Sequence, residues 1–302
     1  MPAWICVRCG VQYPDTAAPP PSCPICEDER EAVPAEGQRW THMAELGSDH
    51  RTEIRTEEPG LTGIGVTPAF GIGQRALLVR TAAGNVLWDC VPLLDEPARR
   101  AIDELGGLSA ICLSHPHFYA AHLEFAAAFD APVFLPRADE QWIPRRSSRI
   151  ELFDDEIEPV PGLTVARIGG HFDGACVLHW PAGAQGRGAL LTGDTIMVVE
   201  DRGWVSFMWS FPNLIPLDAD TVTGIARRIG RFRFDRVYGG WWGHVVLDDG
   251  AAAVRRSAAR YVERLRGSRP GGLVRTSAAR SGSGRCLFAP RRRRAGRSTI
   301  AA

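Results

Sequence analysis

The chain has 302 residues, 45% of them hydrophobic, and its 35 basic residues balance 35 acidic ones. This apolar content excludes a wholly disordered chain, and no run of 18 apolar residues predicts a membrane-spanning helix. The N-terminus has no charged segment followed by an apolar stretch, so we expect no secretory signal. All basic residues are arginine, and eleven of the 35 follow Glu263, so the first 263 residues hold 24 arginines and all 35 acids. We therefore expect an acidic body followed by a basic tail.

Four of the eight cysteines form two Cys-x-x-Cys pairs near the N-terminus, Cys6/Cys9 and Cys23/Cys26. This spacing predicts a closed tetrahedral zinc site over residues 1–30, a segment too short to build a core without metal. The segment resembles a rubredoxin-type or zinc-ribbon knuckle, and iron in the same four thiolates would make it an electron carrier. Two disulfides or free thiols are the alternative. Lone cysteines beside the paired ones favour a reducing compartment, and hence a cytoplasmic location.

After a polar and acidic connector expected at residues 31–60, short apolar runs alternate with turns. Residues 75–81 and 85–90 lie on either side of the turn sequence Ala82-Ala83-Gly84-Asn85 and predict a β-hairpin. Strands interleaved with amphipathic helices predict a layered α/β domain over residues 61–267. Further strands are expected at 110–114, 132–135, 163–168, 176–180, 189–192 and 236–238, and helices at 97–105, 119–129, 218–229 and 248–265.

Residues 268–302 are rich in Ser, Gly, Ala and Arg, and they end in a basic run at 291–294. Few apolar groups and many like charges predict a disordered tail. Binding of nucleic acid or an anionic surface through this tail is the alternative, and elsewhere we expect neither a nucleic-acid nor a membrane partner. The sequence leaves the oligomeric state open.

Metal-binding residue types recur near the ends of predicted strands. His115 and His117 follow the strand at 110–114, His171 follows 163–168, Asp194 follows 189–192, and His244 lies beyond 236–238. A single histidine is more often structural. Three histidines with a carboxylate or water are, however, a common first shell for zinc or iron, so the set predicts a metal site.

These segments resemble the metallo-β-lactamase fold family of metal-dependent hydrolases, over about residues 61–266. The resemblance implies an α/β (α+β) fold, a four-layer αββα sandwich with the metals at one edge between the sheets. It also implies that His115, His117 and His171 hold a first ion, that Asp194 bridges to a second, and that His244 binds the second.

The family pattern His-x-His-x-Asp-His is broken here, because Tyr119 stands where the family has Asp and Ala120 where it has the third His. The second site keeps only Asp194 and His244. The resemblance therefore implies one well-formed zinc site, with a second ion, iron or manganese as alternatives. Tyr119 could be a ligand, a donor to a bound anion, or a space filler. His122 could rescue the second site, although an ordinary helix histidine is favoured.

A metal at this site would activate water to attack an ester, thioester, lactone or phosphodiester. Asp194 and Tyr119 are the candidate catalytic residues. The small-molecule substrate is not identified by the sequence. Aromatic residues near the site suggest a substrate-binding role, with core or lid packing as the alternative; the candidates are Trp209, Trp241 and Trp242.

Three hypotheses stay open from sequence. The first is a metal-dependent hydrolase with one ion in the domain and one in the knuckle. The second is a non-hydrolytic binding or scaffold protein on the same fold. The third is an iron protein in which the cysteine knuckle passes electrons to the histidine site.

Overall fold

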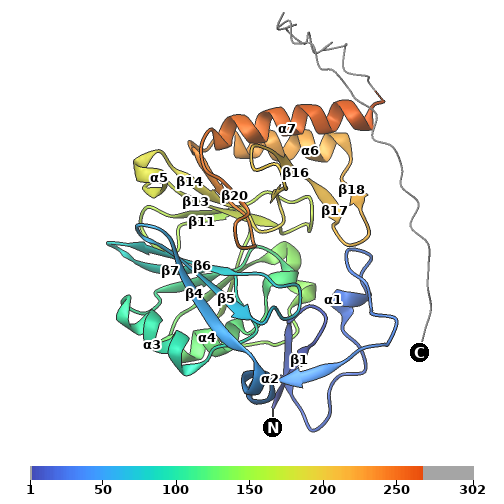
Figure 1. The fold of residues 1–302 in the computed structure, drawn as a ribbon, viewed down its shortest axis with the longest axis vertical. Coiled ribbons are helices and arrows are strands. Elements are labelled where there is room, and N and C mark those ends of the chain that lie inside the picture. The colour runs from blue at the N-terminus through green and yellow to red at the C-terminus, as the bar shows by residue number, and fades with distance from the viewer. Residues whose placement is uncertain (1, 268–302) are drawn as a thin grey trace, which may run out of the picture. The chain divides into compact units, whose positions relative to one another are not determined.

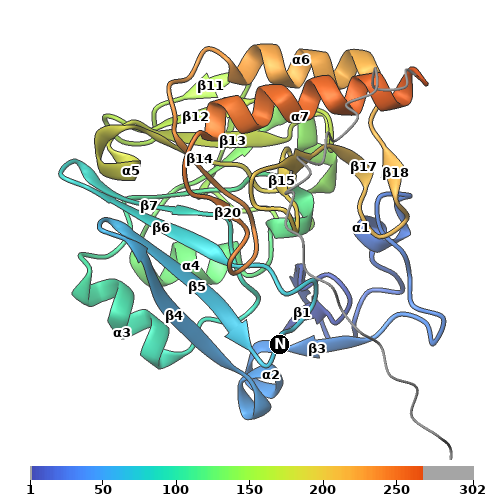
Figure 2. The ribbon, with the colours of Figure 1, turned by 45° about the horizontal axis from the view of Figure 1, so that its top comes forward.

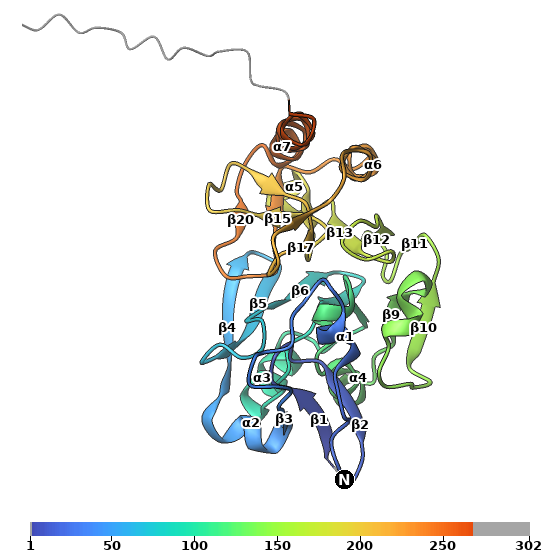
Figure 3. The same ribbon diagram turned by 90° about the vertical axis from the view of Figure 1, so that its right-hand side faces the viewer.

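A computed structural model describes residues 2–267, which lie within one compact unit. Two β-sheets face each other, and a pair of helices covers the outer side of each sheet (Figure 1, Figure 3). This arrangement confirms the predicted four-layer αββα sandwich. The covering helices are α3 (Glu96–Glu104) and α4 (His122–Phe129) on one sheet, and α6 (Ala219–Ile229) and α7 (Gly250–Leu265) on the other.

The first sheet contains β4 (Arg51–Glu58), β5 (Leu61–Thr67), β6 (Ala76–Thr81), β7 (Gly84–Trp88), β8 (Ala110–Cys112), β9 (Val133–Pro136) and β10 (Ile150–Phe153). Its order is β10-β9-β8-β7-β6-β5-β4, antiparallel from β4 to β7 and parallel from β7 to β10. Successive side chains alternate between its faces. On β6, Leu78 packs on the helix side, whereas Leu77 and Val79 pack between the sheets.

The second sheet contains β11 (Glu156–Ile157), β12 (Thr164–Arg167), β13 (Cys176–Trp180), β14 (Ala189–Leu191), β19 (Arg236–Tyr238) and β20 (Val245–Val246). They lie in the order β11-β12-β13-β14-β19-β20. The pair β14–β19 is parallel, and α6 lies in the connection between the two strands. Val222 and Ile225 of α6 and Val254 of α7 pack against Val177 and Leu190 of this sheet.

The chain between β14 and α6 forms two short hairpins. These are β15 (Met197–Val198) with β16 (Val205–Ser206), and β17 (Met208–Ser210) with β18 (Ile215–Pro216). The β17–β18 hairpin extends to α1 (Pro24–Glu27) of the N-terminal segment (Figure 2). The remaining short helices are α5 (Gly183–Gly186) and the 3-10 turns η1 (Pro116–Phe118) and η2 (Arg137–Trp142).

The N-terminal segment is packed against the domain rather than attached by a linker. Its β1 (Ala3–Cys6), β2 (Gln12–Asp15) and β3 (Trp40–His42) form a three-stranded sheet, followed by α2 (Met43–Asp49). Val11 and Ile25 belong to the same buried core as Leu113 and Phe125. Gly71 of the domain approaches so closely that a Cβ there would lie 3.0 Å from the Gly10 nitrogen.

The segment expected as a connector, residues 31–60, carries regular structure. Strand β3 pairs with β1, and β4 forms the edge of the first sheet, so the sheet begins at Arg51 rather than at residue 61. The sequence of β4, RTEIRTEE, is polar because an edge strand is partly exposed to water.

The predicted hairpin is confirmed, since β6 and β7 pair antiparallel. The strands at 176–180 and 236–238 have the predicted bounds, and the four predicted helices are present with ends shifted by at most three residues. Over residues 2–267, no helix has the length and apolar character needed to cross a membrane. The tail expected at residues 268–302 lies outside the described residues.

Candidate metal centres

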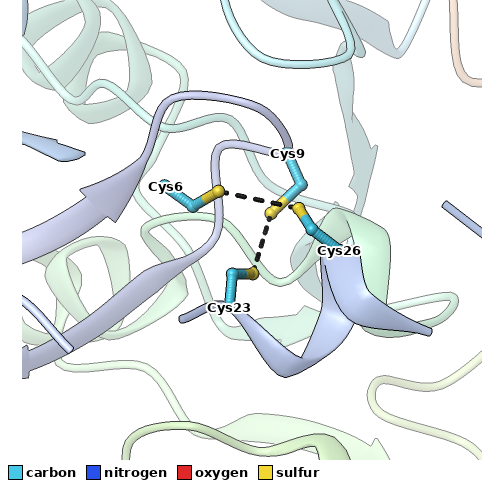
Figure 4. Close-up of side chains that lie close together, drawn as sticks. All are labelled: Cys6, Cys9, Cys23 and Cys26. Atoms are coloured by element: carbon cyan, nitrogen blue, oxygen red, sulfur yellow. Dashed lines mark hydrogen bonds between the residues drawn. The ribbon is translucent and has the colours of Figure 1, made fainter. Parts of the chain in front are cut away.

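The four N-terminal cysteines converge on one point (Figure 4). The Cys6 and Cys26 sulfurs lie 3.6 Å apart, and those of Cys9 and Cys23 lie 3.7 Å apart. Thiolates placed about 2.3 Å from a tetrahedral ion would be separated by about 3.8 Å. The four buried sulfurs therefore fit a closed tetrahedral metal site.

Local structure places these sulfurs. Cys6 ends β1, and the turn after it closes when the Gly10 N–H donates to the Cys6 carbonyl at 2.8 Å. Gly10 has φ +79°, a conformation that favours glycine. Two side chains also contact the sulfurs: the Tyr13 hydroxyl lies 3.0 Å from Cys23 Sγ, and Gln38 Nε2 donates to Cys6 Sγ at 3.0 Å. Such donors stabilise the thiolate form that a metal requires.

The second centre brings together four of the predicted ligands. One ligand atom each from His115, His117, His171 and Asp194 lies within 4.8 Å of the others. His171 Nε2 is 3.2 Å from His117 Nδ1, and Asp194 Oδ2 is 3.4 Å from His115 Nε2 and 3.8 Å from His171 Nε2.

Three atoms of this centre are buried without a hydrogen-bond partner among residues 2–267, namely His115 Nε2, His117 Nε2 and Asp194 Oδ1. Buried polar atoms in proteins are nearly always satisfied, so the orphaned atoms indicate a missing partner. Neutral imidazoles with a carboxylate are a donor set suited to zinc, and the residues fit a divalent ion.

Hydrogen bonds away from the centre orient the histidine rings. Ser114 Oγ is 2.8 Å from His115 Nδ1, and His171 Nδ1 donates to the Met208 carbonyl at 3.1 Å. Asp89 fixes the start of the same loop, because its buried carboxylate accepts from the Ser114 N–H at 2.7 Å. These contacts leave the opposite ring nitrogens of His115 and His171 facing Asp194.

Burial sets the protonation of the centre. It lowers the pKa of His115 and His117 well below the usual value and that of His171 to about 4, so all three imidazoles are neutral at pH 7. The neutral ring is the form that binds metal. Burial also raises the pKa of Asp194 to about 6, with a smaller opposing effect from His171.

Tyr119 and Ala120 lie at the break in the family pattern, and neither residue lines the pocket described below. Tyr119 is fully buried in the helix-side core, and its hydroxyl has no partner among the described residues. Ala120 has φ +40°, and its carbonyl accepts from the Gln12 N–H of the N-terminal segment at 3.3 Å. His122 bonds back to the Tyr119 carbonyl through Nδ1 at 2.9 Å and is not part of the four-residue centre.

The other predicted site residues lie further out. His244 is not among the four clustered ligands; its ring lies 6.2 Å from that of Trp241, between centroids. Trp241 lines the pocket, whereas Trp209 stacks on the Arg30 guanidinium at 3.7 Å. Trp242 covers β5, where a Cβ on Gly63 or Gly65 would come within 2.7 Å of its ring.

The histidine centre opens into a pocket of about 350 Å³, a volume suited to a small molecule. His117, His171 and Asp194 form its base. Apolar residues from three loops form one part of the wall: Ile72, Phe211, Pro212 and Trp241. The remaining wall comes from the N-terminal segment and consists of Arg8, Arg30 and Glu31.

Sequence reasoning missed Asp89 and these three N-terminal residues. An acid directly after the buried strand β7 was a usable signal for Asp89, because strand ends are where this domain carries its other polar site residues. No local signal marked Arg30. Its Nε donates to the carbonyl of His171, 141 positions away, at 2.7 Å.

The family is settled by comparison with known proteins. The model of the Metallo-beta-lactamase superfamily matches residues 71–241. The chain belongs to the metallo-beta-lactamase superfamily. It is also 45% identical over 268 residues to "Uncharacterized protein YmaE" of Bacillus subtilis (strain 168), which covers 88% of this chain and 97% of that protein.

Solved structures agree on the superfamily fold. A crystal structure of VMB-1 matches with a TM-score of 0.54 at 13% identity, covering 71% of this chain and 98% of that one. The DIM-1 metallo-beta-lactamase gives a TM-score of 0.54 at 13% identity, covering 70% of this chain and 97% of that one. At this identity the likeness concerns the fold alone. Superfamily members typically bind metal ions, in keeping with the two ligand clusters.

Proposed function

We propose that this protein is a metal-dependent hydrolase that acts on a small ester, thioester, lactone or phosphodiester with one ion in the domain. The observation that carries the proposal is the convergence of four buried ligand residues, with three side-chain atoms among them lacking a partner in the described part of the chain, beside a pocket lined by His117, His171 and Asp194. A closed structural site needs no pocket, whereas a catalytic one keeps a side open to substrate.

His115, His117, His171 and Asp194 would hold the ion. When bound there, a divalent ion supplies Lewis acidity, which makes water nucleophilic near neutral pH and polarises an acyl or phosphoryl oxygen. The chain's own contribution is to keep three imidazoles neutral by burial and to orient them through Ser114 and the Met208 carbonyl. Asp194 Oδ1 has no protein partner among the described residues and is the candidate acceptor for a proton from water.

One ion rather than two is favoured by the surroundings of Tyr119 and Ala120. Tyr119 is packed in the core, and the Ala120 backbone is engaged by Gln12, so this loop offers the pocket neither a carboxylate nor an imidazole. Zinc is the proposed ion in both centres. For Tyr119, a candidate catalytic residue from the sequence, we propose a packing role instead.

The test combines metal analysis with a substrate panel. The full chain is purified without chelator, its metals are counted per chain, and hydrolysis of 4-nitrophenyl esters, a thioester, a lactone and bis(4-nitrophenyl) phosphate is followed. We expect one ion per centre and turnover of at least one substrate class, lost on chelation and restored by zinc.

Metal in both centres without turnover of any class would favour the scaffold alternative. Two irons with a visible thiolate-to-iron absorption would favour the redox alternative instead.

A further inference from the structure

Two arginines of the N-terminal knuckle line the pocket beside the histidine centre. Arg8 lies between the ligands Cys6 and Cys9, and Arg30 follows Cys26 by four residues. Arg8 therefore lies in a loop that the cysteine centre closes, and Arg30 lies just beyond its last ligand. Three metal ligands of the domain, His117, His171 and Asp194, share one cavity with these two cations although they lie far from them in the sequence.

Arg30 is held in one orientation. Its guanidinium lies 3.7 Å from the Trp209 ring centroid and 4.3 Å from that of Phe172. Its Nε donates to the His171 carbonyl at 2.7 Å, and its Nη1 donates to Asp28 Oδ1 at 2.7 Å. Within residues 2–267, Nη2 has no hydrogen-bond partner. An immobilised guanidinium with a spare donor binds an anion at low entropic cost.

Arg8 is the more exposed of the two cations. It pairs with Glu31 through Nε at 3.0 Å and Nη2 at 2.9 Å, and its side chain is 35% exposed. Burial raises the pKa of Glu31, with Arg8 opposing the change. Burial thus disfavours the charged form of Glu31, the partner of Arg8. An anion bound in the pocket would share the Arg8 guanidinium with Glu31.

The charge of the pocket points the same way. Its charged lining consists of Arg8, Arg30, Glu31 and Asp194, and Asp28 pairs with Arg30 at 2.7 Å, so these formal charges sum to −1. A divalent ion in the histidine centre would add its full double positive charge to this small volume. Such a site attracts anionic ligands and repels cationic ones.

We propose that Arg8 and Arg30 form an anion subsite, so that the pocket selects small substrates carrying a carboxylate or phosphate group beyond the bond to be cleaved. The apolar wall at Ile72, Phe211 and Trp241 suits the part of the substrate between that group and the reacting bond. The knuckle thus acts as a specificity element. The inference rests on the proposed hydrolytic function for the cleavage step, but not for the binding of the anion.

Kinetics and direct binding together test this subsite. The kinetic arm compares kcat/KM for 4-nitrophenyl hexanoate with that for mono-4-nitrophenyl adipate, which has the same chain length and a terminal carboxylate. The binding arm titrates the full chain with adipate and with inorganic phosphate by calorimetry, which shows which of the two anions the subsite prefers.

We expect wild type to favour the adipate ester, and Arg8→Gln to lower the adipate-to-hexanoate ratio about tenfold to hundredfold, as for a lost charge-assisted hydrogen bond. The Kd of the preferred anion should weaken by a similar factor. Arg30→Lys keeps the charge but not the fork, and should give an intermediate ratio. Arg39→Gln removes an exposed arginine that does not line this pocket, and should leave both readouts at the wild-type value.

Equal effects of Arg8→Gln on both esters, or anion binding unchanged in that variant with metal content and Tm intact, would overturn the subsite. Those results would leave hydrolysis standing. Conversely, a wild type that hydrolyses neither these esters nor any class of the wider substrate panel, but binds adipate or phosphate through Arg8, would refute the proposed function and retain the subsite.

Discussion

The two metal centres of this chain are built in opposite ways. The cysteine centre draws its ligands from positions 6 to 26, and all four sulfurs are buried. The histidine centre draws its ligands from positions 115 to 194, in loops of both sheets, and opens into a pocket. One is local in sequence and closed, and the other is long-range and open on one side.

This difference shows what each centre depends on. Four like ligands in a closed shell need only their own short loops, and their metal stabilises the fold around it. Four mixed ligands at one edge of two sheets need the whole sandwich to be in place. Yet the centres are joined, because Arg30 of the knuckle holds the His171 carbonyl.

The largest effect is expected from a substitution that removes a ligand of the cysteine centre. Cys23→Ser should lose the knuckle metal, and because that segment shares the domain's core, Tm should fall by about 10 °C or more. Metal per chain and the thermal unfolding curve measure both. The matched control is Cys90→Ala, a buried thiol of the same core outside both ligand clusters, which should keep both metals. A Cys23→Ser protein with wild-type Tm would show that the knuckle contributes little to the fold.

The next largest effect is expected from a substitution that removes a ligand of the histidine centre. His117→Ala should lose the domain ion and lower hydrolysis by about a hundredfold or more, with the knuckle metal retained. His122→Ala is the comparison, since His122 lies five residues along the chain but outside the cluster, and it should keep both ions. Loss of an ion in His122→Ala would show that His122 helps to hold a second ion in the domain.

A smaller effect concerns pH. Asp139 lies below the His171 loop, where its Oδ1 accepts from the Gly174 N–H at 2.8 Å, and burial raises its pKa to about 7. Folded Asp139 keeps a proton between about pH 4 and 7 that the unfolded chain releases, so its contribution to stability falls as pH rises through that window. Asp139→Asn removes this titration. The Tm of the variant relative to wild type should rise from about pH 4 to 7 and stay level above it, and a flat difference would contradict the raised pKa.

The smallest effect concerns the open side of the histidine centre. Gly63→Ala would place a Cβ 2.5 Å from the ring of Trp242, the residue after Trp241 of the pocket wall. It should lower the free energy of unfolding by about 1–3 kcal/mol. Gly224→Ala on α6, where a Cβ meets nothing within 4 Å, should instead stabilise by about 0.5–1 kcal/mol. Denaturant unfolding measures both changes in free energy. Equal effects of the two substitutions would show that the Trp242 ring moves aside without loss of stability.

The sequence pattern predicted most strands and helices and the four clustered ligands, whereas the four-layer arrangement was implied by the family resemblance. Buried strands are short apolar runs, and His115, His117, His171 and Asp194 each follow such a run. Strand β4 escaped this reading because, at the edge of its sheet, it keeps polar side chains.

The contacts between the knuckle and the pocket could not be predicted in the same way. The bond from Arg30 to His171 and those from Asn213 to the Glu29 and Glu31 carbonyls join residues more than 140 positions apart and follow no periodic pattern. Ala120 has a positive φ, which its residue type does not predict, and Tyr119 before it is fully buried.

The core that the knuckle shares with the domain limits how the chain can be cut. Its size and cysteine spacing make residues 1–30 look like a detachable module. Removing them would expose apolar side chains such as Leu113 and Phe125 to water and leave the pocket without one wall. A shortened chain would then be prone to aggregate, so modularity, which the sequence suggests for this protein, is lost at the level of packing.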